Sequence, residues 1–215
     1  SFRVAMHIDM DEGEILECDI FGESDLMPER DMWMLSDYLV PILRKDEIEA
    51  GAEALLEKYN PEALYDLKTH NAIDMAERMG LRVMMLPLYK RPKTKSLLFF
   101  CESEIAACLD QEDQSKEIPE IVLIPANTIV INTNHIPEDS CQMNIYHECI
   151  HFDWHYLFYR LQDMHNNDVK SLKTRRVVKT AKTRRENPLL MMEGQARRGS
   201  YGLYMPAPVM RAEIK

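Results

Sequence analysis

Hydrophobic and polar positions alternate in two short segments near the N-terminus. These segments are Phe2–Ile8 and Glu14–Ile20, and the residues between them include Asp11, Glu12 and Gly13, which suit a turn. Alternation with a period of two places one set of side chains on each face of a strand. The first twenty residues therefore predict a β-hairpin.

Apolar residues recur at helical spacing over the next part of the chain. The pattern predicts helices over Asp31–Leu43, Asp46–Tyr59 and Leu67–Met79. Asp46 suits the N-cap of the second helix, and Gly80 suits the end of the third. We expect three helices to follow the hairpin.

Strand and helix patterns share the remainder of the sequence. Strand patterns cover Leu81–Leu88, Ser96–Cys101, Ile121–Ile124 and Asn127–Thr133, and helical patterns cover residues 140–164 and Asn187–Tyr204. Pro188 at the start of the last helix and Pro206 after its end are favourable placements. The pattern as a whole predicts an α+β fold, a helical domain with a small mixed β-sheet.

Charge is distributed unevenly along the 215 residues, whose net charge is −10. Residues 1–60 carry sixteen acidic and five basic side chains, whereas residues 169–185 carry eight basic and no acidic ones. We interpret residues 1–60 as an acidic N-terminal extension, a hairpin plus helix, and residues 61–215 as the main domain. The basic segment suits a solvated loop or a surface for an acidic partner.

Composition narrows the class of protein. Five dispersed cysteines without a CxxC pair argue against a disulfide framework and favour a reducing, cytoplasmic environment. No apolar run reaches the roughly 18 residues that a membrane span needs, so we expect a soluble protein. The acidic total, and the lack of aromatic residues among the basic ones of residues 169–185, argue against direct nucleic-acid binding.

The segment His147–His151 reads HECIH, which is an HExxH motif. Histidines four residues apart share one face of a helix, and both can reach a single Zn²⁺ at about 2.0–2.1 Å. Glu148 lies next to the first histidine, where it can hold a metal-bound water and take its proton. The motif predicts a metallopeptidase helix.

The predicted helix has an apolar stripe and a histidine stripe. The apolar stripe consists of Ile145, Cys149, Phe152 and Tyr156, and the opposite side carries His147, His151 and His155. His155 lies eight residues beyond His147, about 12 Å along the axis, which is too far for both to hold one ion. We interpret His155 as a group behind the ligands, a substrate-facing group or a polar surface residue.

A catalytic zinc ion needs a third protein ligand and an open position. The downstream candidates are Asp153, Asp163, His165, Asp168, Glu186, Glu193 and Glu213. Glu193 falls on a helical stripe with Leu189, Leu190, Ala196 and Leu203. An unpaired carboxylate on such a packing face is costly, and a metal would compensate it. An ion pair with an arginine of the basic segment is the alternative explanation.

These motifs resemble the ImmA/IrrE family of zinc metallopeptidases over about residues 61–210. The resemblance rests on the HECIH motif with His155, on Glu193–Ala196 (EGQA) and on Met205-Pro206. It implies that His147, His151 and Glu193 hold zinc in a zincin-like site and that Glu148 is the general base. It also implies a protein substrate, since such enzymes cut a cognate DNA-binding repressor.

The sequence thus favours hydrolysis of a peptide bond by a water that zinc binds and Glu148 activates. His155, Tyr201 and Tyr204 are candidate donors to the oxyanion, and the sequence does not choose among them. The alternative is a non-catalytic, zinc-binding regulatory module of a mobile element or stress response. Glu148 favours the enzyme, because binding alone needs no general base.

Overall fold

The computed structural model describes residues 2–8, 15–23, 33–36, 38–91, 93–109, 119–137, 140–159 and 187–213. Contacts divide the chain into two units, Ser1–Met34 and Leu35–Lys215. The sequence interpretation placed the boundary after residue 60. The contact boundary falls earlier because helix α1 (Lys45–Tyr59) packs on helix α5 (Pro188–Tyr204) of the second unit. The basic segment 169–185 lies outside the described residues.

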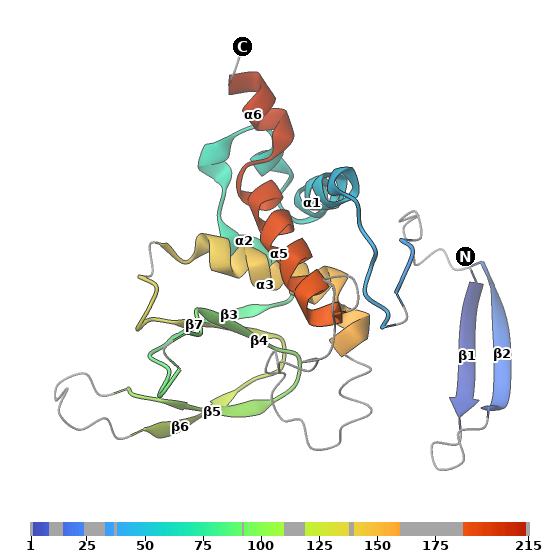
Figure 1. Cartoon of the computed structure of the whole chain (residues 1–215), viewed down its shortest axis with the longest axis horizontal. Coiled ribbons are helices and arrows are strands. Elements are labelled where there is room, and N and C mark those ends of the chain that lie inside the picture. Colours follow the sequence, from blue (N-terminus) through green and yellow to red (C-terminus); the bar gives the residue numbers. More distant parts are fainter. Residues whose placement is uncertain are drawn as a thin grey trace. The chain divides into compact units, whose positions relative to one another are not determined.

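The first unit contains the predicted hairpin. Strands β1 (Phe2–Ile8) and β2 (Ile15–Glu23) pair antiparallel, with Val4 opposite Ile20 and Met6 opposite Cys18 (Figure 1). The hairpin prediction is therefore confirmed, although the predicted turn residues lie outside the described part of the chain.

The second unit contains two small sheets. Strands β3 (Arg82–Leu86), β7 (Thr128–Asn132) and β4 (Ser96–Phe99) form a mixed sheet in that order, and β5 (Ser103–Ala107) pairs antiparallel with β6 (Glu120–Ile124). All five residues of β7 are buried, as its central position requires. Strand β5 was not expected, because its alternation is short and includes two alanines.

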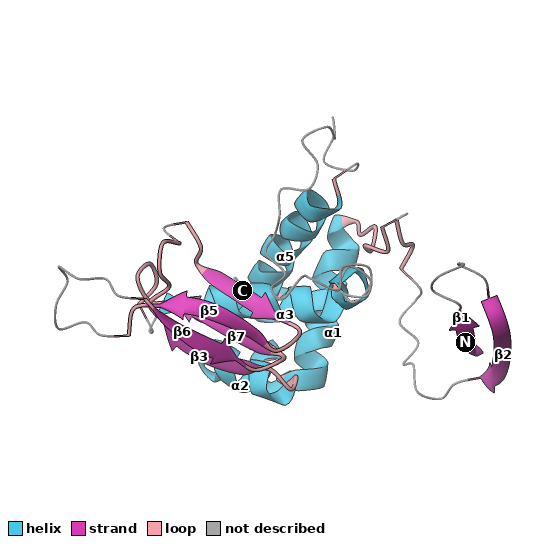
Figure 2. Ribbon diagram, turned by 90° about the horizontal axis from the view of Figure 1, so that it is seen from below, coloured by secondary structure: helices cyan, strands magenta, loops and turns pink. Residues whose placement is uncertain are grey.

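The elements of the second unit stack in layers. A buried cluster that includes Leu86, Phe99, Ile105, Ile124 and Val130 joins the two sheets. Helix α3 (Gln142–Trp154) contacts β4 and β7 on the other side of the mixed sheet (Figures 1 and 2). The mixed sheet therefore lies between the helices and the β5–β6 pair, and the predicted α+β class with a small mixed sheet is confirmed.

Helix α5 begins where the sequence predicts. Asn187 is its N-cap and accepts hydrogen bonds from the backbone N–H groups of Leu189 and Leu190, while Pro188 occupies the first turn. This unit also contains helices α2 (Ala72–Arg78) and α6 (Ala207–Glu213) and the short 3₁₀ helices η1 (Pro61–Leu64) and η2 (Leu67–Thr69). Helix α6 was not expected.

The helix predicted over Asp31–Leu43 is wrong for the described part of that range. Leu39 adopts a left-handed backbone with φ 58°, and the backbone N–H of Val40 donates to the Ser36 hydroxyl. Leu35 forms a β-bridge with Pro41, which cannot donate a helical hydrogen bond. A compact turn therefore precedes α1.

Other predicted helix ends shift for local reasons. The helix predicted from Leu67 begins at Ala72, because the Asn71 side chain caps it. The helix predicted over residues 140–164 ends at Trp154, although residues 156–159 are again helical. The cap of α1 is Arg44 rather than Asp46, and the Glu47 carboxylate accepts from the Arg44 N–H at 2.6 Å.

Candidate metal centre

Helices α3 and α5 supply the candidate ligands. His147 and His151 lie one turn apart on α3, and Glu193 lies on α5. Of the predicted apolar stripe, Ile145 and Cys149 on α3 are fully buried and hold the helix against the core, whereas Phe152 is partly buried and Tyr156 is exposed. The two histidines thus project from a helix that cannot easily rotate.

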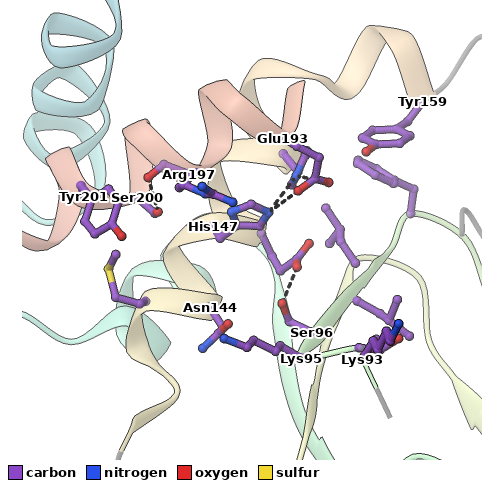
Figure 3. A pocket seen from close by; sticks show the side chains of 17 residues that line it. Lys93, Lys95, Ser96, Asn144, His147, Tyr159, Glu193, Arg197, Ser200 and Tyr201 are labelled. Carbon is purple, nitrogen blue, oxygen red and sulfur yellow. Dashed lines mark hydrogen bonds and ion pairs between the residues drawn. The ribbon is translucent and has the colours of Figure 1, made fainter. Parts of the chain in front are cut away.

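The three side chains converge, and Figure 3 shows two of them, His147 and Glu193, facing each other. The Nε2 atoms of His147 and His151 are 3.1 Å apart, and each lies 3.4 Å from a carboxylate oxygen of Glu193. Ligands at about 2.0–2.1 Å from a tetrahedral zinc ion lie about 3.3 Å from one another. The two 3.4 Å contacts end on different oxygens of Glu193, Oε2 for His147 and Oε1 for His151. One potential ligand atom from each residue lies within 4.8 Å of the other two, so the three residues can hold a metal ion.

Electrostatics also suit a cation. Burial alone would raise the pKa of Glu193, but hydrogen bonds and charge from His147 and His151 outweigh burial and hold the pKa well below its usual range. Burial alone would lower the pKa of His147, but Glu193 and Glu148 raise it despite opposition from Arg197. The surroundings of Glu193 and His147 thus favour positive charge at this point, and a bound metal ion would supply it.

Glu193 reaches the site for a different reason from the one expected. Its side chain is 44% exposed and lies at the edge of the cleft, whereas Met192, Ala196 and Leu203 form the buried stripe of α5. Packing of this stripe sets the rotation of the helix, and Glu193 then faces the histidines. The sequence argument placed the Glu193 carboxylate on a packing face, but the structure does not place it there.

Glu148 is buried beside the two histidines, with 7% of its surface exposed. The Ser96 hydroxyl on β4 donates to Glu148 Oε1 at 2.6 Å (Figure 3). Such a bond to a carboxylate is short and fixes the orientation of the side chain. Sequence reasoning missed Ser96, because the two residues are 52 positions apart and no local pattern joins them.

His155 is fully buried behind the ligands. Its Nδ1 lies 3.0 Å from His151 Nδ1, and its Nε2 lies 2.8 Å from Gln195 Oε1. Burial, and next the neighbouring His151, hold the pKa of His155 well below its ordinary value. His155 is therefore not a surface residue, and it is not among the residues that line the cleft described below.

The site opens into a cleft of about 580 Å³ between β4 and α5. Lys93, Lys95 and Arg197 line it, together with Tyr159 and Tyr201 (Figure 3). Burial raises the pKa of Tyr159, and the charges of Glu148 and then Glu193 raise it further. This hydroxyl therefore stays protonated and can donate, although sequence reasoning missed it.

The two tyrosines named from the sequence differ in position. Tyr201 lines the cleft and is half exposed. Tyr204 instead meets the His70 ring edge-on, with ring centroids 6.4 Å apart. Tyr201 thus stays a candidate substrate-facing group, whereas the structure does not place Tyr204 among the residues that line the cleft.

The other sequence candidates do not join the site in the described part of the chain. Among the described residues, the group formed by His147, His151 and Glu193 is the one set of three potential metal ligands that converge. The candidates Asp163, His165, Asp168 and Glu186 lie outside those residues. Asp153, on α3, does not belong to the converging group.

Comparison with protein-family models, with curated proteins and with solved structures yields no significant match. No helix in the described residues is both long and apolar enough to cross a membrane. The functional argument therefore rests on the residues and geometry of the site.

Proposed function

We propose that this protein is a zinc-dependent metallopeptidase with a zincin-like helix, of the ImmA/IrrE type. The observation that carries the proposal is the triangle of His147, His151 and Glu193 directly beside the buried Glu148. A zinc ion bound there would supply Lewis-acid chemistry, lowering the pKa of a water molecule and polarising a carbonyl group. Binding alone would not require the neighbouring carboxylate.

Glu148 is the general base in this proposal. Its Oε1 is held by the Ser96 hydroxyl, so Oε2 is the oxygen that takes the proton from the attacking water. Glu148 then passes the proton to the leaving amine. We assign the Tyr159 hydroxyl as the donor to the developing oxyanion. It lies close enough to Glu148 and Glu193 for their charges to raise its pKa.

A peptide substrate suits the cleft. The Asn132 N–H of β7 donates to the carbonyl of Lys95, the residue just before β4. Backbone groups alternate in direction along a strand, so those of Ser96 and Leu98 point away from β7. β4 is an edge strand in the described part of its sheet, and such an edge can pair with an extended peptide. The resemblance in motif makes a DNA-binding repressor the protein substrate that we propose.

The test compares zinc-loaded wild type with Glu148→Gln on a defined peptide library analysed by mass spectrometry. We expect wild type to cleave and Glu148→Gln to lose cleavage while keeping its zinc, because an amide cannot accept the proton. Glu77→Gln, an exposed change on α2, is the matched control and should cleave normally. Equal cleavage by Glu148→Gln would contradict the role of Glu148, and an inactive zinc-loaded wild type would favour the non-catalytic module.

A further inference from the structure

A buried chain of hydrogen bonds runs from the metal site to the segment before α1. His151 Nδ1 and His155 Nδ1 are 3.0 Å apart, and His155 Nε2 lies 2.8 Å from Gln195 Oε1. The Gln195 side-chain nitrogen donates to the Pro41 carbonyl at 2.5 Å. His151, His155 and Gln195 each expose no more than 4% of their surface, so water does not compete for these bonds.

The Pro41 carbonyl fixes the direction of the whole chain. A carbonyl oxygen only accepts, so the Gln195 amide must turn its NH₂ group toward Pro41 and its oxygen toward His155. The flipped amide would bring two oxygen atoms together at hydrogen-bonding distance and would face His155 Nε2 with a donor. The orientation of the Gln195 amide is thus set by the Pro41 carbonyl, which can only accept a hydrogen bond.

The protons of both imidazoles follow from that orientation. Gln195 Oε1 requires a proton on His155 Nε2, and a neutral imidazole carries only one, so His155 Nδ1 is an acceptor. The facing nitrogen, His151 Nδ1, must then donate. His151 Nε2, which lies 3.1 Å from His147 Nε2 and 3.4 Å from Glu193 Oε1, is then the nitrogen that a metal ion can take.

We infer that His155 and Gln195 are positioning residues that hold His151 in its metal-binding tautomer. They do so from the Pro41 carbonyl, which makes the segment before α1 part of the support of the metal site. The inference rests on the metal centre of the proposed function. Outer hydrogen-bond partners of this kind orient a ligand and typically contribute about 10- to 100-fold in metal affinity.

The segment that carries Pro41 is suited to this role. Val40 and Pro41 are buried, and the turn that holds them is closed by Ser36, whose hydroxyl accepts from the Val40 N–H. Gln195 and Pro41 are 154 positions apart, so this bond joins the segment before α1 to α5. A movement of this turn would release Gln195 and, through His155, His151.

The experiment uses the full chain and two readouts that need no peptidase activity. Zinc affinity is measured by competition with a chelator. The His151 tautomer is read by ¹⁵N NMR of the metal-free protein at about pH 8, above the ordinary pKa of a free imidazole. In wild type we expect the His151 proton on Nδ1. Gln195→Met keeps the volume but removes both hydrogen bonds, so the tautomers should mix and zinc affinity should fall about 10- to 100-fold.

Two further variants separate positioning from packing. Gln195→Glu keeps an acceptor for His155 but sets an oxygen against the Pro41 carbonyl, so it should not restore the wild-type tautomer and affinity. Full restoration would mean that the Pro41 carbonyl plays no part in holding His151. Met192→Leu alters the packing of α5 at a fully buried site outside the hydrogen-bond chain and should change neither readout. Equal loss of affinity in Met192→Leu and Gln195→Met, at equal thermal stability, would mean that Gln195 only packs.

The outcomes distinguish this inference from the proposed function. A His151 proton on Nε2 in metal-free wild type, or wild-type affinity in Gln195→Met, would overturn the inference and leave the peptidase proposal standing. Failure of the zinc-loaded protein to cleave any peptide would contradict the peptidase proposal, and the tautomer result would stand without it.

Discussion

Two residues of this site each use one polar side-chain atom in a hydrogen bond within the protein and keep the other for the cleft. His151 uses Nδ1 toward His155, which leaves Nε2 for a metal ion. Glu148 uses one carboxylate oxygen toward Ser96, which leaves the other for a proton. Ser96 and His155 therefore orient Glu148 and His151, and that orientation determines which atoms take part in the proposed chemistry.

Ser96→Ala tests this principle on the proposed base. Loss of the hydroxyl frees Glu148 to rotate and should lower peptidase kcat about tenfold, which corresponds to about 1.4 kcal/mol. Zinc content should be unchanged, because the Ser96 hydroxyl bonds to Glu148, which is not one of the proposed ligands. Steady-state kinetics beside metal analysis would check both. Unchanged kcat would mean that Glu148 needs no support from β4.

The sequence predicted the residues whose geometry is local. His147, Glu148 and His151 follow from one helical turn, and Glu193 followed from a motif and from a stripe that the structure assigns to other side chains. Ser96 and the Pro41 carbonyl could not be predicted, because each meets its partner across a long separation in sequence. Only folding brings such pairs together.

The position of Glu193 depends on how closely helix α5 approaches its neighbouring helices, and two glycines of α5 allow this close approach. A Cβ added to Gly199 on α5 would lie 2.8 Å from the Ile150 side chain of α3, and one added to Gly202 would lie 2.8 Å from Ala52 of α1. Helix α5 therefore packs closely on α3 at Gly199 and on α1 at Gly202. Its approach to α3 decides whether Glu193 reaches the histidines.

Gly199→Ala should separate α5 from α3. We expect destabilisation of about 1–3 kcal/mol from overpacking, together with weaker zinc binding. Gly202→Ala is the matched comparison: it should also destabilise, but its clash is with α1, so zinc affinity should fall less. Urea unfolding and chelator competition on both variants would measure this. Equal zinc affinity in wild type and Gly199→Ala would contradict the proposed link.

Elements were predictable where their pattern was local and strong. The hairpin, α1, α5 and three strands of the mixed sheet follow from periodicity, caps and strand length. The helix expected over Asp31–Leu43 failed because its apolar spacing was overridden by Pro41 and by the Ser36 turn. Periodicity alone does not reveal such a turn.

The charge of the cleft contrasts with that of the whole molecule. The chain carries −10, yet in the cleft the three basic side chains of Lys93, Lys95 and Arg197 outnumber the two acidic ones of Glu148 and Glu193. A bound divalent cation would add further positive charge. A positive cleft on an acidic protein concentrates negatively charged ligands.

Peptides with acidic residues beside the scissile bond should therefore be preferred. Among matched acidic, neutral and basic peptides, we expect kcat/KM to be highest for the acidic one and to fall as salt rises. Arg197→Ala should reduce this preference severalfold, whereas Arg82→Ala, an exposed change outside the cleft, should not. A preference for basic peptides would contradict the charge argument.

Zinc binding by wild type and Glu193→Ala tests the central claim most directly. The Glu193 carboxylate lies between two histidine nitrogens at ligand spacing, so wild type should bind one zinc ion per chain. Glu193→Ala should weaken that binding by about 100-fold or more, since it removes one of three protein ligands. Glu77→Ala, a change on exposed α2, should bind as wild type does. Wild-type affinity in Glu193→Ala, or a wild type that takes up no zinc, would contradict the account.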